Sequence, residues 1–116
     1  MLYEKPKFRI MGDRSLLVEL GDEICPSVNQ RVQELFTALD LHPVDGVKEL
    51  VPSYRSLLVV YDPLNLSLDN LKRTVRDVYE NLDQTELPEP RTIDIPVVYG
   101  GEMGPDLESV AQYHQI

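Results

Sequence analysis

The amino-acid sequence predicts an α+β domain, a two-layer ββαββα sandwich in which an antiparallel sheet carries two helices on one face. The main observation is a repeat. The pentapeptide Arg-Ser-Leu-Leu-Val stands at 14–18 and again, 41 positions later, at 55–59. Turn residues precede each copy, and an apolar stripe with helical spacing follows each one. Two strand–strand–helix units cannot bury their apolar faces alone, so we expect them to share one sheet.

Each pentapeptide is expected to form the second strand of a hairpin. Gly12 and Asp13 before the first copy, and residues 52–54 before the second, are typical turn residues. Short strands over 8–11 and 47–51 lead into these turns, and the segments RSLLVEL and RSLLVVY lead out of them. The sheet is therefore built from two hairpins.

A helix is predicted after each hairpin. Pro26 suits the first position of a helix, and Ser67 suits an N-cap, with Asp69 in the first turn where the helix dipole favours a carboxylate. These two helix starts are also 41 positions apart. The apolar stripes are Val28, Val32, Leu35, Phe36 and Leu39 in the first helix and Leu68, Leu71, Val75, Val78 and Leu82 in the second.

The second pentapeptide strand is apolar on both of its faces. Leu57, Val59 and Tyr61 alternate with Leu58 and Val60. Two interpretations stay open. Helices cover one face and a second domain, a sister subunit or another copy of the chain covers the other; or the strand is central and leaves a few aliphatic side chains exposed. The first interpretation predicts an interface, including a homodimer, on the open face of the sheet.

The C-terminal part of the chain is predicted to open a second domain. The polar stretch 84–90, with two prolines, is typical of a linker. After it, Ile93, Ile95 and Val97 alternate as in a strand, and Pro105 is expected to start a helix. The apolar stripe of that helix is Leu107, Val110, Ala111 and His114. We therefore expect a folded domain over 1–87, a linker over 88–91, and the first strand and helix of a truncated domain over 92–116.

The charge and composition exclude several classes of protein. A formal net charge of −9 and a pI near 4.5 repel nucleic-acid phosphates and anionic membrane surfaces, so neither is an expected partner. No apolar run approaches the ~20 residues that span a bilayer, and the N-terminus lacks the apolar centre of a signal peptide. A single cysteine cannot form an internal disulfide, and we expect a cytoplasmic protein.

No stretch carries a recognisable catalytic or metal site. Two histidines and one cysteine give no metal-ligand spacing. Cys25 has no basic neighbour in sequence, and Asp22 and Glu23 are expected to raise its pKa. The glycine-rich loop before the last helix has the shape of an anion site. Because Asp106 and its acidic neighbours already place negative charge there, a plain turn is favoured.

Tyr54 and Arg55 lie in or beside the tip of the second hairpin. An aromatic side chain next to an arginine in an exposed turn is typical of a binding anchor. The alternative is an ordinary turn with Tyr54 folded onto the sheet.

Three stretches together resemble a known family. They are GDRSLLVELGDEI, GVKELVPSYRSLLVVYDP and IPVVYGGEMGPDLESVA. The chain is similar along nearly its whole length to the allophanate hydrolase subunit 1 family. That family includes the B subunit of bacterial 5-oxoprolinase, a Kip-type inhibitor of a sporulation histidine kinase, and subdomains C and D of the carboxyltransferase region of urea carboxylases. The resemblance implies a ββαββα domain followed by a cyclophilin-like β-barrel, most of which this sequence lacks.

The resemblance also implies which residues belong to the family's motifs. Tyr54, Arg55 and Ser56 match its hairpin motif and are candidate partner-binding residues. The opening motif of its second domain is matched by Gly100, Gly101, Gly104, Pro105 and Asp106. No catalytic residue is carried over, because that chemistry is expected in the absent barrel.

Two functions of different classes follow from the resemblance. In the first, the chain is an assembly and interaction domain in a subunit of an ATP-dependent amidohydrolase complex, such as 5-oxoprolinase, beside a homologous second subunit. ATP would then be used by the full complex, and no cofactor is expected on this chain. In the second, the chain is a protein-binding inhibitor of a sensor histidine kinase.

Overall fold

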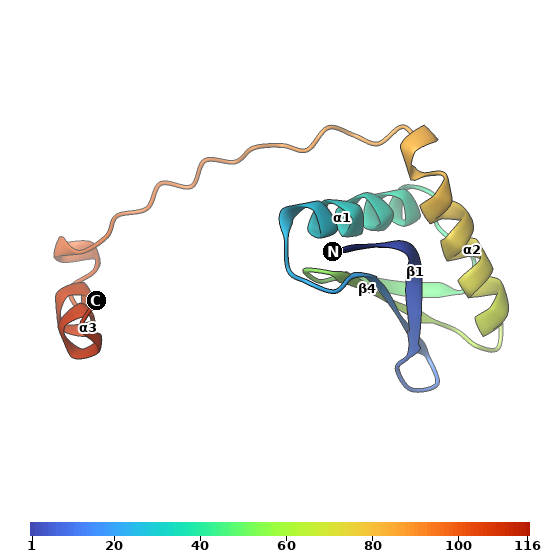
Figure 1. Ribbon diagram of the computed structural model, residues 1–116, viewed down its shortest axis with the longest axis horizontal. Coiled ribbons are helices and arrows are strands. Elements are labelled where there is room, and N and C mark those ends of the chain that lie inside the picture. The colour runs from blue at the N-terminus through green and yellow to red at the C-terminus, as the bar shows by residue number, and fades with distance from the viewer.

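The computed structural model describes residues 1–116 and shows an α+β arrangement with a four-stranded antiparallel sheet (Figure 1). Along the chain the elements are β1 (Leu2–Ile10), β2 (Ser15–Gly21), α1 (Pro26–Leu41), β3 (Val47–Pro52), β4 (Ser56–Tyr61) and α2 (Leu68–Glu80). They are followed by two 3-10 turns, η1 (Leu82–Gln84) and η2 (Gly101–Met103), and by the helix α3 (Leu107–His114). The predicted α+β class with an antiparallel sheet is confirmed.

The strand order β1-β2-β4-β3 puts the two pentapeptides side by side at the centre of the sheet. Leu16 pairs with Val59, and Val18 pairs with Leu57. The counterpart of a residue is the one 41 positions away, so Leu57 is the counterpart of Leu16 and Val59 that of Val18. The two pairs are therefore equivalent, because each contains the counterparts of the other. Leu17 and Leu58 are counterparts of each other and also pair directly, so a pseudo-two-fold axis crosses the sheet between them. The two copies therefore pack against one another in equivalent surroundings.

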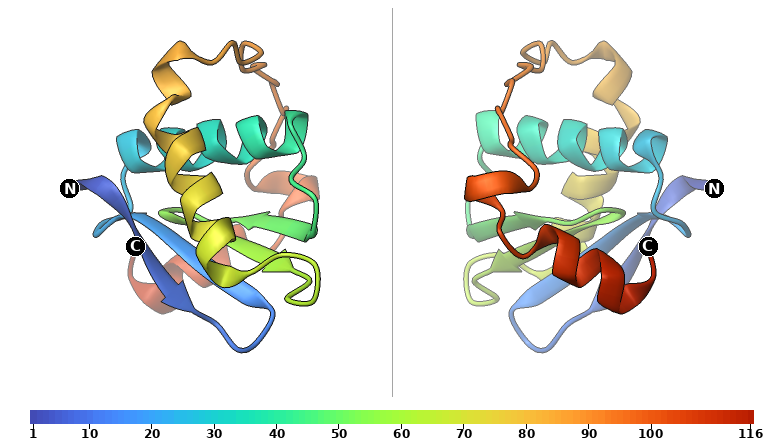
Figure 2. Two further views of the ribbon diagram at one scale, coloured as in Figure 1. Left: turned by 90° about the vertical axis from the view of Figure 1, so that its right-hand side faces the viewer. Right: turned by 90° about the vertical axis from the view of Figure 1, so that its left-hand side faces the viewer.

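The hydrophobic core lies between one face of the sheet and the two helices. Leu16, Val18, Leu57 and Val59 are completely buried on that face. The helices contribute Val28, Val32, Leu35, Ala38, Leu39, Leu71, Val75 and Tyr79. Figures 1 and 2 show α1 and α2 over the same side of the sheet. The centres of both predicted stripes are buried, while Phe36, Leu68 and Val78 are only partly buried at the edges.

The first strand is longer than the sequence indicates. A strand was expected only over 8–11, whereas β1 begins at Leu2 and contains several charged residues. Its pairing with β2 is irregular between Leu2 and Lys7, where Pro6 lies. Because β1 is an edge strand, one side of its backbone needs no partner strand, and proline and charged residues are tolerated there.

The helix starts agree with the sequence. Pro26 occupies the first turn of α1. The Ser67 hydroxyl accepts a hydrogen bond of 3.2 Å from the Asn70 N–H, which caps α2, and Asp69 lies in the first turn of that helix. None of the helices is both long enough and apolar enough to cross a lipid bilayer.

The chain leaves the folded domain after η1. Leu87 still packs against the core, and the following residues extend away from it towards η2 and α3 (Figure 1). The expected strand through Ile93, Ile95 and Val97 is not formed, because no other segment pairs with it, and these side chains are 60–75% exposed. A radius of gyration of 19.1 Å, against about 13 Å for a compact chain of this length, reflects the extended part.

The last helix also differs from its prediction. It begins at Leu107 rather than Pro105, and none of its residues is buried. His114 is exposed, and the expected apolar stripe does not pack against the folded domain, since its Leu107 lies only beside Gly100 of the preceding turn.

Candidate functional site

The hairpin motif of Tyr54, Arg55 and Ser56 forms the tip between β3 and β4. Tyr54 is 66% exposed and is not folded onto the sheet. Arg55 points back into the domain, where its Nη1 donates a 3.1 Å hydrogen bond to the carbonyl oxygen of Gly21. Ser56 begins β4, and its carbonyl oxygen accepts a 2.9 Å hydrogen bond from the Ser53 N–H. Arg55 therefore anchors the tip, and Tyr54 is the side chain left free to contact a partner.

Asn29 of α1 fastens this tip to the helix layer. Its amide Nδ2 donates to the carbonyl oxygens of Ser53 and Tyr54, at 3.4 and 3.3 Å. A shallow cavity of about 320 Å³ lies beside it, lined by Asn29, Gln33, Pro52, Ser53 and Tyr54. Sequence reasoning missed Asn29. The one signal in the sequence was its counterpart Asn70, 41 positions later. Because the two helices begin 42 positions apart, at Pro26 and Leu68, Asn29 is the fourth residue of its helix and Asn70 the third.

The glycine-rich motif forms an exposed turn in front of α3. Gly100 and Gly101 have φ values of +77° and +61°, which side chains other than glycine disfavour. A Cβ on Gly104 would lie 2.9 Å from the backbone nitrogen of Gly100, so the turn is too tight for a side chain there. Asp106 is the N-cap residue of α3 but makes no side-chain capping hydrogen bond. The five motif residues are brought together as a turn that does not touch the folded domain.

The pKa of Cys25 was predicted in the wrong direction. The Ser27 hydroxyl, 3.3 Å from the Cys25 sulfur, and then the Val28 N–H lower this pKa by stabilising the thiolate. Glu23 raises it, but by less than those two groups lower it. The error arose because the sequence shows neighbouring charges and not the hydrogen-bond donors at the helix start.

An ionic cluster joins α1 to η1. Arg31 lies 2.9 Å from Glu34 Oε2 and 3.1 Å from Asp83 Oδ1, and its guanidinium stands 5.5 Å from the centre of the Tyr79 ring. Burial opposes the charge on Arg31, but the hydrogen bonds to Glu34 and Asp83 outweigh it, so the pKa of Arg31 is raised. Burial also raises the pKa of Tyr79. This cluster fixes the end of the domain. One of its members, Glu34, also lines a broad cavity of about 720 Å³ between α1 and residues 87–91.

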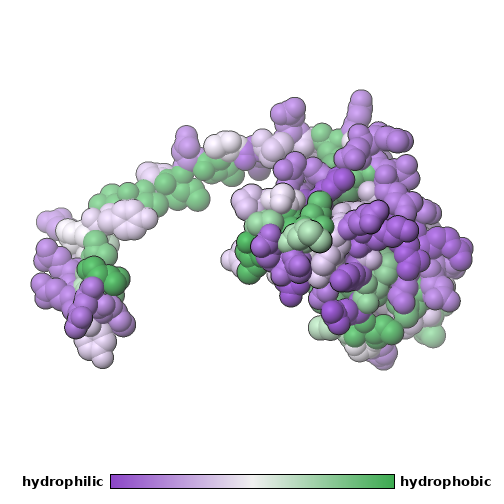
Figure 3. All heavy atoms as spheres, in the orientation of Figure 1, coloured by the Kyte–Doolittle hydropathy of each residue, from purple (hydrophilic) through white to green (hydrophobic).

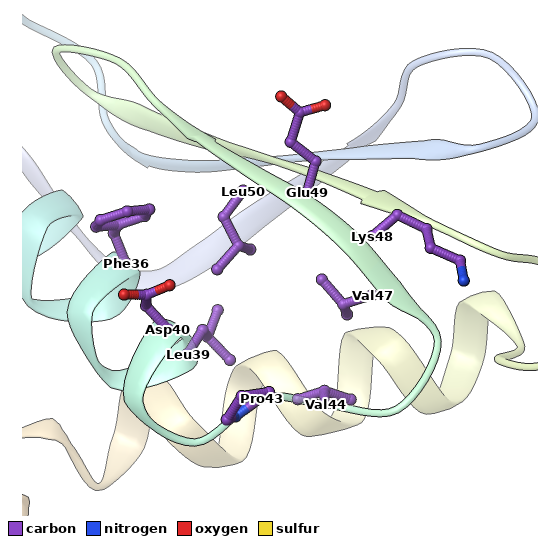
Figure 4. A pocket seen from close by; sticks show the side chains of 9 residues that line it. All are labelled: Phe36, Leu39, Asp40, Pro43, Val44, Val47, Lys48, Glu49 and Leu50. Atoms are coloured by element: carbon purple, nitrogen blue, oxygen red, sulfur yellow. The ribbon is translucent and has the colours of Figure 1, made fainter.

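A groove of about 270 Å³ runs between the end of α1 and the edge strand β3 (Figure 4). Its apolar lining includes Phe36, Leu39, Val47 and Leu50. Figure 4 shows Leu50 pointing towards α1 and Glu49 pointing away from it. Because Asp40, Lys48 and Glu49 also belong to the lining, the groove is of mixed polarity and does not by itself indicate a class of ligand.

The sheet face opposite the helices is open. Leu57, Val59 and Tyr61 face the helices, so Leu58 and Val60 belong to the open face, where both are half-buried. Glu19 lies on the same face yet is only 7% exposed, with its Oε2 3.0 Å from Arg9 Nε. The doubly apolar strand therefore gives one set of side chains to the core and one to an accessible surface.

These features together offer surfaces for binding. The structure contains no group of three or more His, Cys, Asp or Glu side chains that could hold a metal ion. The predicted partner-binding residues at the hairpin tip are not close to the glycine-rich turn, which lies beyond the extended segment (Figure 1).

Comparisons with family models and with curated proteins point to the same family. The model of the carboxyltransferase domain, subdomain C and D, matches residues 6–116. The chain is 33% identical over 116 residues to the B subunit of 5-oxoprolinase from Bacillus subtilis strain 168, covering 91% of this chain and 48% of that protein. It is 32% identical to the protein of the same name from Escherichia coli O157:H7, covering 95% of this chain and 49% of that protein. The chain spans about half the length of the curated relatives it matches.

Solved structures agree with these relatives. An uncharacterised protein of Pyrococcus horikoshii superposes with a TM-score of 0.62 at 38% identity, over 95% of this chain and 50% of that one. The N-terminal domain of the histidine kinase inhibitor KipI from Bacillus subtilis superposes with a TM-score of 0.53 at 25% identity, over 69% of this chain and 86% of that one. Since the family model covers nearly every residue, including both halves of the internal repeat and the glycine-rich turn, this chain belongs to the family of the carboxyltransferase domain, subdomain C and D.

Proposed function

We propose that this chain supplies an assembly and interaction domain to a subunit of an ATP-dependent amidohydrolase complex of the 5-oxoprolinase or allophanate hydrolase type. The observation that carries the proposal is the likeness to the B subunit of 5-oxoprolinase along 91% of the chain. The described side chains offer an exposed aromatic anchor and an open sheet face, which suit binding to another protein. ATP is used elsewhere in this complex, and the domain needs no cofactor of its own.

The proposal assigns a role to the extended segment and α3. Residues 1–87 form the ββαββα sandwich, 88–91 a linker, and 92–116 the opening of a second, cyclophilin-like domain. Two observations support this division. The family match continues through the tail, and large side chains there lie uncovered, among them Ile95, Tyr99 and Tyr113. Figure 3 shows hydrophobic residues exposed along the extended segment. A cytoplasmic location fits the free thiol of Cys25.

Reconstitution tests the enzyme role. The tagged chain is mixed with the second carboxyltransferase-type subunit and the ATP-using subunit from the same genome, and two quantities are measured. We expect the second subunit to be retained with the tagged chain, and ADP release to become dependent on 5-oxoproline or allophanate only when all parts are present. The chain alone is expected to turn over neither ATP nor 5-oxoproline. Failure to retain the second subunit, with ADP release unchanged by the chain, contradicts the proposal.

A second candidate function is inhibition of a sensor histidine kinase. It is favoured by the likeness to the N-terminal domain of the inhibitor KipI and by the 66% exposure of Tyr54 at a tip held in place by Asn29 and Arg55. A rigid tip with a free aromatic side chain can enter a groove between kinase helices at little entropic cost.

The matched variants Tyr54→Ala and Tyr113→Ala test this candidate. Both tyrosines are exposed, but only Tyr54 lies on the folded domain. If the chain is an inhibitor, it slows autophosphorylation of a sporulation-type kinase without any other subunit, and Tyr54→Ala reduces the effect at least tenfold while Tyr113→Ala does not. Equal inhibition by both variants, or none by the unaltered chain, excludes the hairpin tip as the inhibitory surface.

A further inference from the structure

The charged residues that the strand register places on the open sheet face balance one another, although the chain as a whole is strongly acidic. The register places four charged residues on this face, namely Lys7 and Arg9 on β1, Glu19 on β2 and Glu49 on β3. Two are positive and two are negative, whereas the chain has a formal net charge of −9. A second copy of the chain is repelled by most of this molecule but not by this face.

The apolar residues of the face form a continuous row at its centre. Leu17, Leu58 and Val51 are direct neighbours across β2, β4 and β3. Val60 lies one step along β4, and Val51 is 41% exposed. Leu17 and Leu58 lie on either side of the pseudo-two-fold axis, which is perpendicular to the sheet. A rotation of 180° about this axis exchanges the two leucines and leaves the centre of the face nearly unchanged.

The charges are separated to opposite edges of this apolar centre. Lys7 and Arg9 lie on the edge strand β1, and Glu49 lies on the edge strand β3 and points away from the helix layer (Figure 4). Turning a second copy by 180° about an axis parallel to the strands lays its β3 over β1 of the first copy. Each basic edge then faces an acidic edge, and the apolar centres meet between them.

From this pattern we propose that the open face binds a second copy of this chain, face to face, with the two-fold axis parallel to the strands. The arrangement is an aligned stacking of two sheets, as in other β-sandwich contacts. The buried Glu19 already pairs with Arg9 of its own chain and needs no group from the second copy. The dimer is weak, because four apolar side chains contribute and docking costs rotational and translational freedom. The proposal goes beyond the role in a hydrolase complex and does not depend on the identity of that complex.

Sedimentation of the full chain tests whether the face associates. We expect a concentration-dependent monomer–dimer equilibrium, with the dissociation constant raised at least tenfold by Val51→Lys and by Leu58→Lys. Two controls are Leu64→Lys, at a loop position that is 93% exposed, and Ile95→Lys in the extended segment. Both controls are expected to dimerise normally. Circular dichroism reports folding, and Val51→Lys keeps the test valid should Leu58→Lys fail to fold. A monomer at concentrations up to about 1 mM, or association lost only in Ile95→Lys, overturns the proposal.

A charge exchange tests the orientation of the two copies. Glu49→Lys puts a positive charge opposite Arg9 of the second copy. Arg9→Glu, made together with Glu19→Gln so that two carboxylates do not meet within the chain, puts a negative charge opposite Glu49. Each variant alone is expected to dimerise at least tenfold more weakly than the unaltered chain, and the equimolar mixture is expected to recover association. Variants that weaken association separately but show no recovery when mixed exclude this orientation.

Discussion

The two strand–strand–helix units are alike at the centre of the sheet and different at the beginnings of their helices. β2 and β4 share a pentapeptide and pair about Leu17 and Leu58. In contrast, α1 begins after Cys25 without a side-chain cap, whereas Ser67 caps α2. The units are thus identical over the pentapeptides that contact each other across the pseudo-two-fold axis, and they differ at the ends of this pairing, in Glu19 and Val60, and at the helix starts. The comparison teaches that the repeated residues are those at which the two units pack against each other, and the equivalence of the units can be tested position by position.

The largest expected effect is at counterpart positions of the core. Leu16 and Leu57 are both completely buried and occupy equivalent places in the two units. Leu16→Ala and Leu57→Ala should each lower the free energy of unfolding by about 2–5 kcal/mol, since each removes buried surface and leaves a cavity. Urea unfolding followed by circular dichroism measures both, with Leu64→Ala as an exposed control. If one substitution costs less than half of the other, the two units are not energetically equivalent.

The second effect concerns the turns that follow β2 and β4. A Cβ on Gly21 would lie 2.5 Å from Cγ2 of Val28, so Gly21→Ala should cost about 1–3 kcal/mol through overpacking. The counterpart residue Asp62 accepts a 3.0 Å hydrogen bond from the Leu64 N–H, and Asp62→Ala should cost about 0.5–1.5 kcal/mol. Chemical unfolding of the two variants should therefore rank Gly21→Ala as the more damaging. The double substitution Gly21→Ala/Val28→Ala should relieve the overpacking part of that cost.

The third effect lies at the helix caps. Ser67→Ala removes the 3.2 Å hydrogen bond from Asn70 and should cost about 1 kcal/mol. Cys25 places a sulfur at the N-cap of α1, where Ser67 places a hydroxyl at the N-cap of α2. Cys25→Ser should therefore stabilise the protein by up to about 1 kcal/mol, because the hydroxyl is the better acceptor. Thermal melting should move in opposite directions for the two variants. If Cys25→Ser lowered the melting temperature, the packing of the thiol would stabilise the protein more than a capping hydroxyl does.

The fourth effect is a dependence of stability on pH, and it arises at Tyr79, where the two units differ. Tyr79 of α2 is the counterpart of Ala38 in α1, and burial raises the pKa of Tyr79. The unfolded chain, whose tyrosines titrate near 10, therefore loses this proton first as the pH rises. The folded state then binds more protons than the unfolded state, and stability must fall above about pH 10. We expect Tyr79→Phe to reduce this fall when urea midpoints at pH 8 and about pH 11 are compared. A fall of equal size in both proteins contradicts the assignment to Tyr79.

The smallest expected effect is removal of the extended segment and α3. Both units and their core lie before residue 88, and Leu87 is the last residue that packs against the core. A chain ending at Leu87 should unfold cooperatively, with a urea midpoint equal to that of residues 1–116 within error. A broad, non-cooperative transition would show that the two units need the tail to pack.

The fold was predictable where local pattern and tertiary packing agree. The pentapeptides, Pro26, Ser67 and the centres of both helical stripes were located correctly, because each has a periodicity or a cap chemistry of its own. The early part of β1 was missed, since an edge strand can contain Pro6 and charged residues that conceal its alternation. The strand through Ile93 was predicted but is not formed. Alternating apolar residues make a strand possible, but they do not show that a partner strand is present.

The candidate site was predictable only in part. The sequence placed Tyr54 and Arg55 at a hairpin tip but left open whether Tyr54 is exposed or folds onto the sheet. It also gave no sign that Arg55 donates to the carbonyl oxygen of Gly21, 34 positions away, because no local pattern reveals such a contact. For the same reason Asn29 was missed and the pKa of Cys25 was assigned the wrong direction, since both depend on donors and acceptors that folding brings together.

The stretch without helix or strand between Thr85 and Gly100 also works as a tether. Fully extended, it reaches about 50 Å, far enough to pass beyond the domain itself. Short flexible connections hold two attached groups at an effective concentration in the millimolar range. A partner that engages both the sheet domain and the residues around α3 therefore gains avidity, and two individually weak contacts add up to one durable attachment. Stiffening by prolines such as Pro88 and Pro90 narrows the range of separations over which this gain is available.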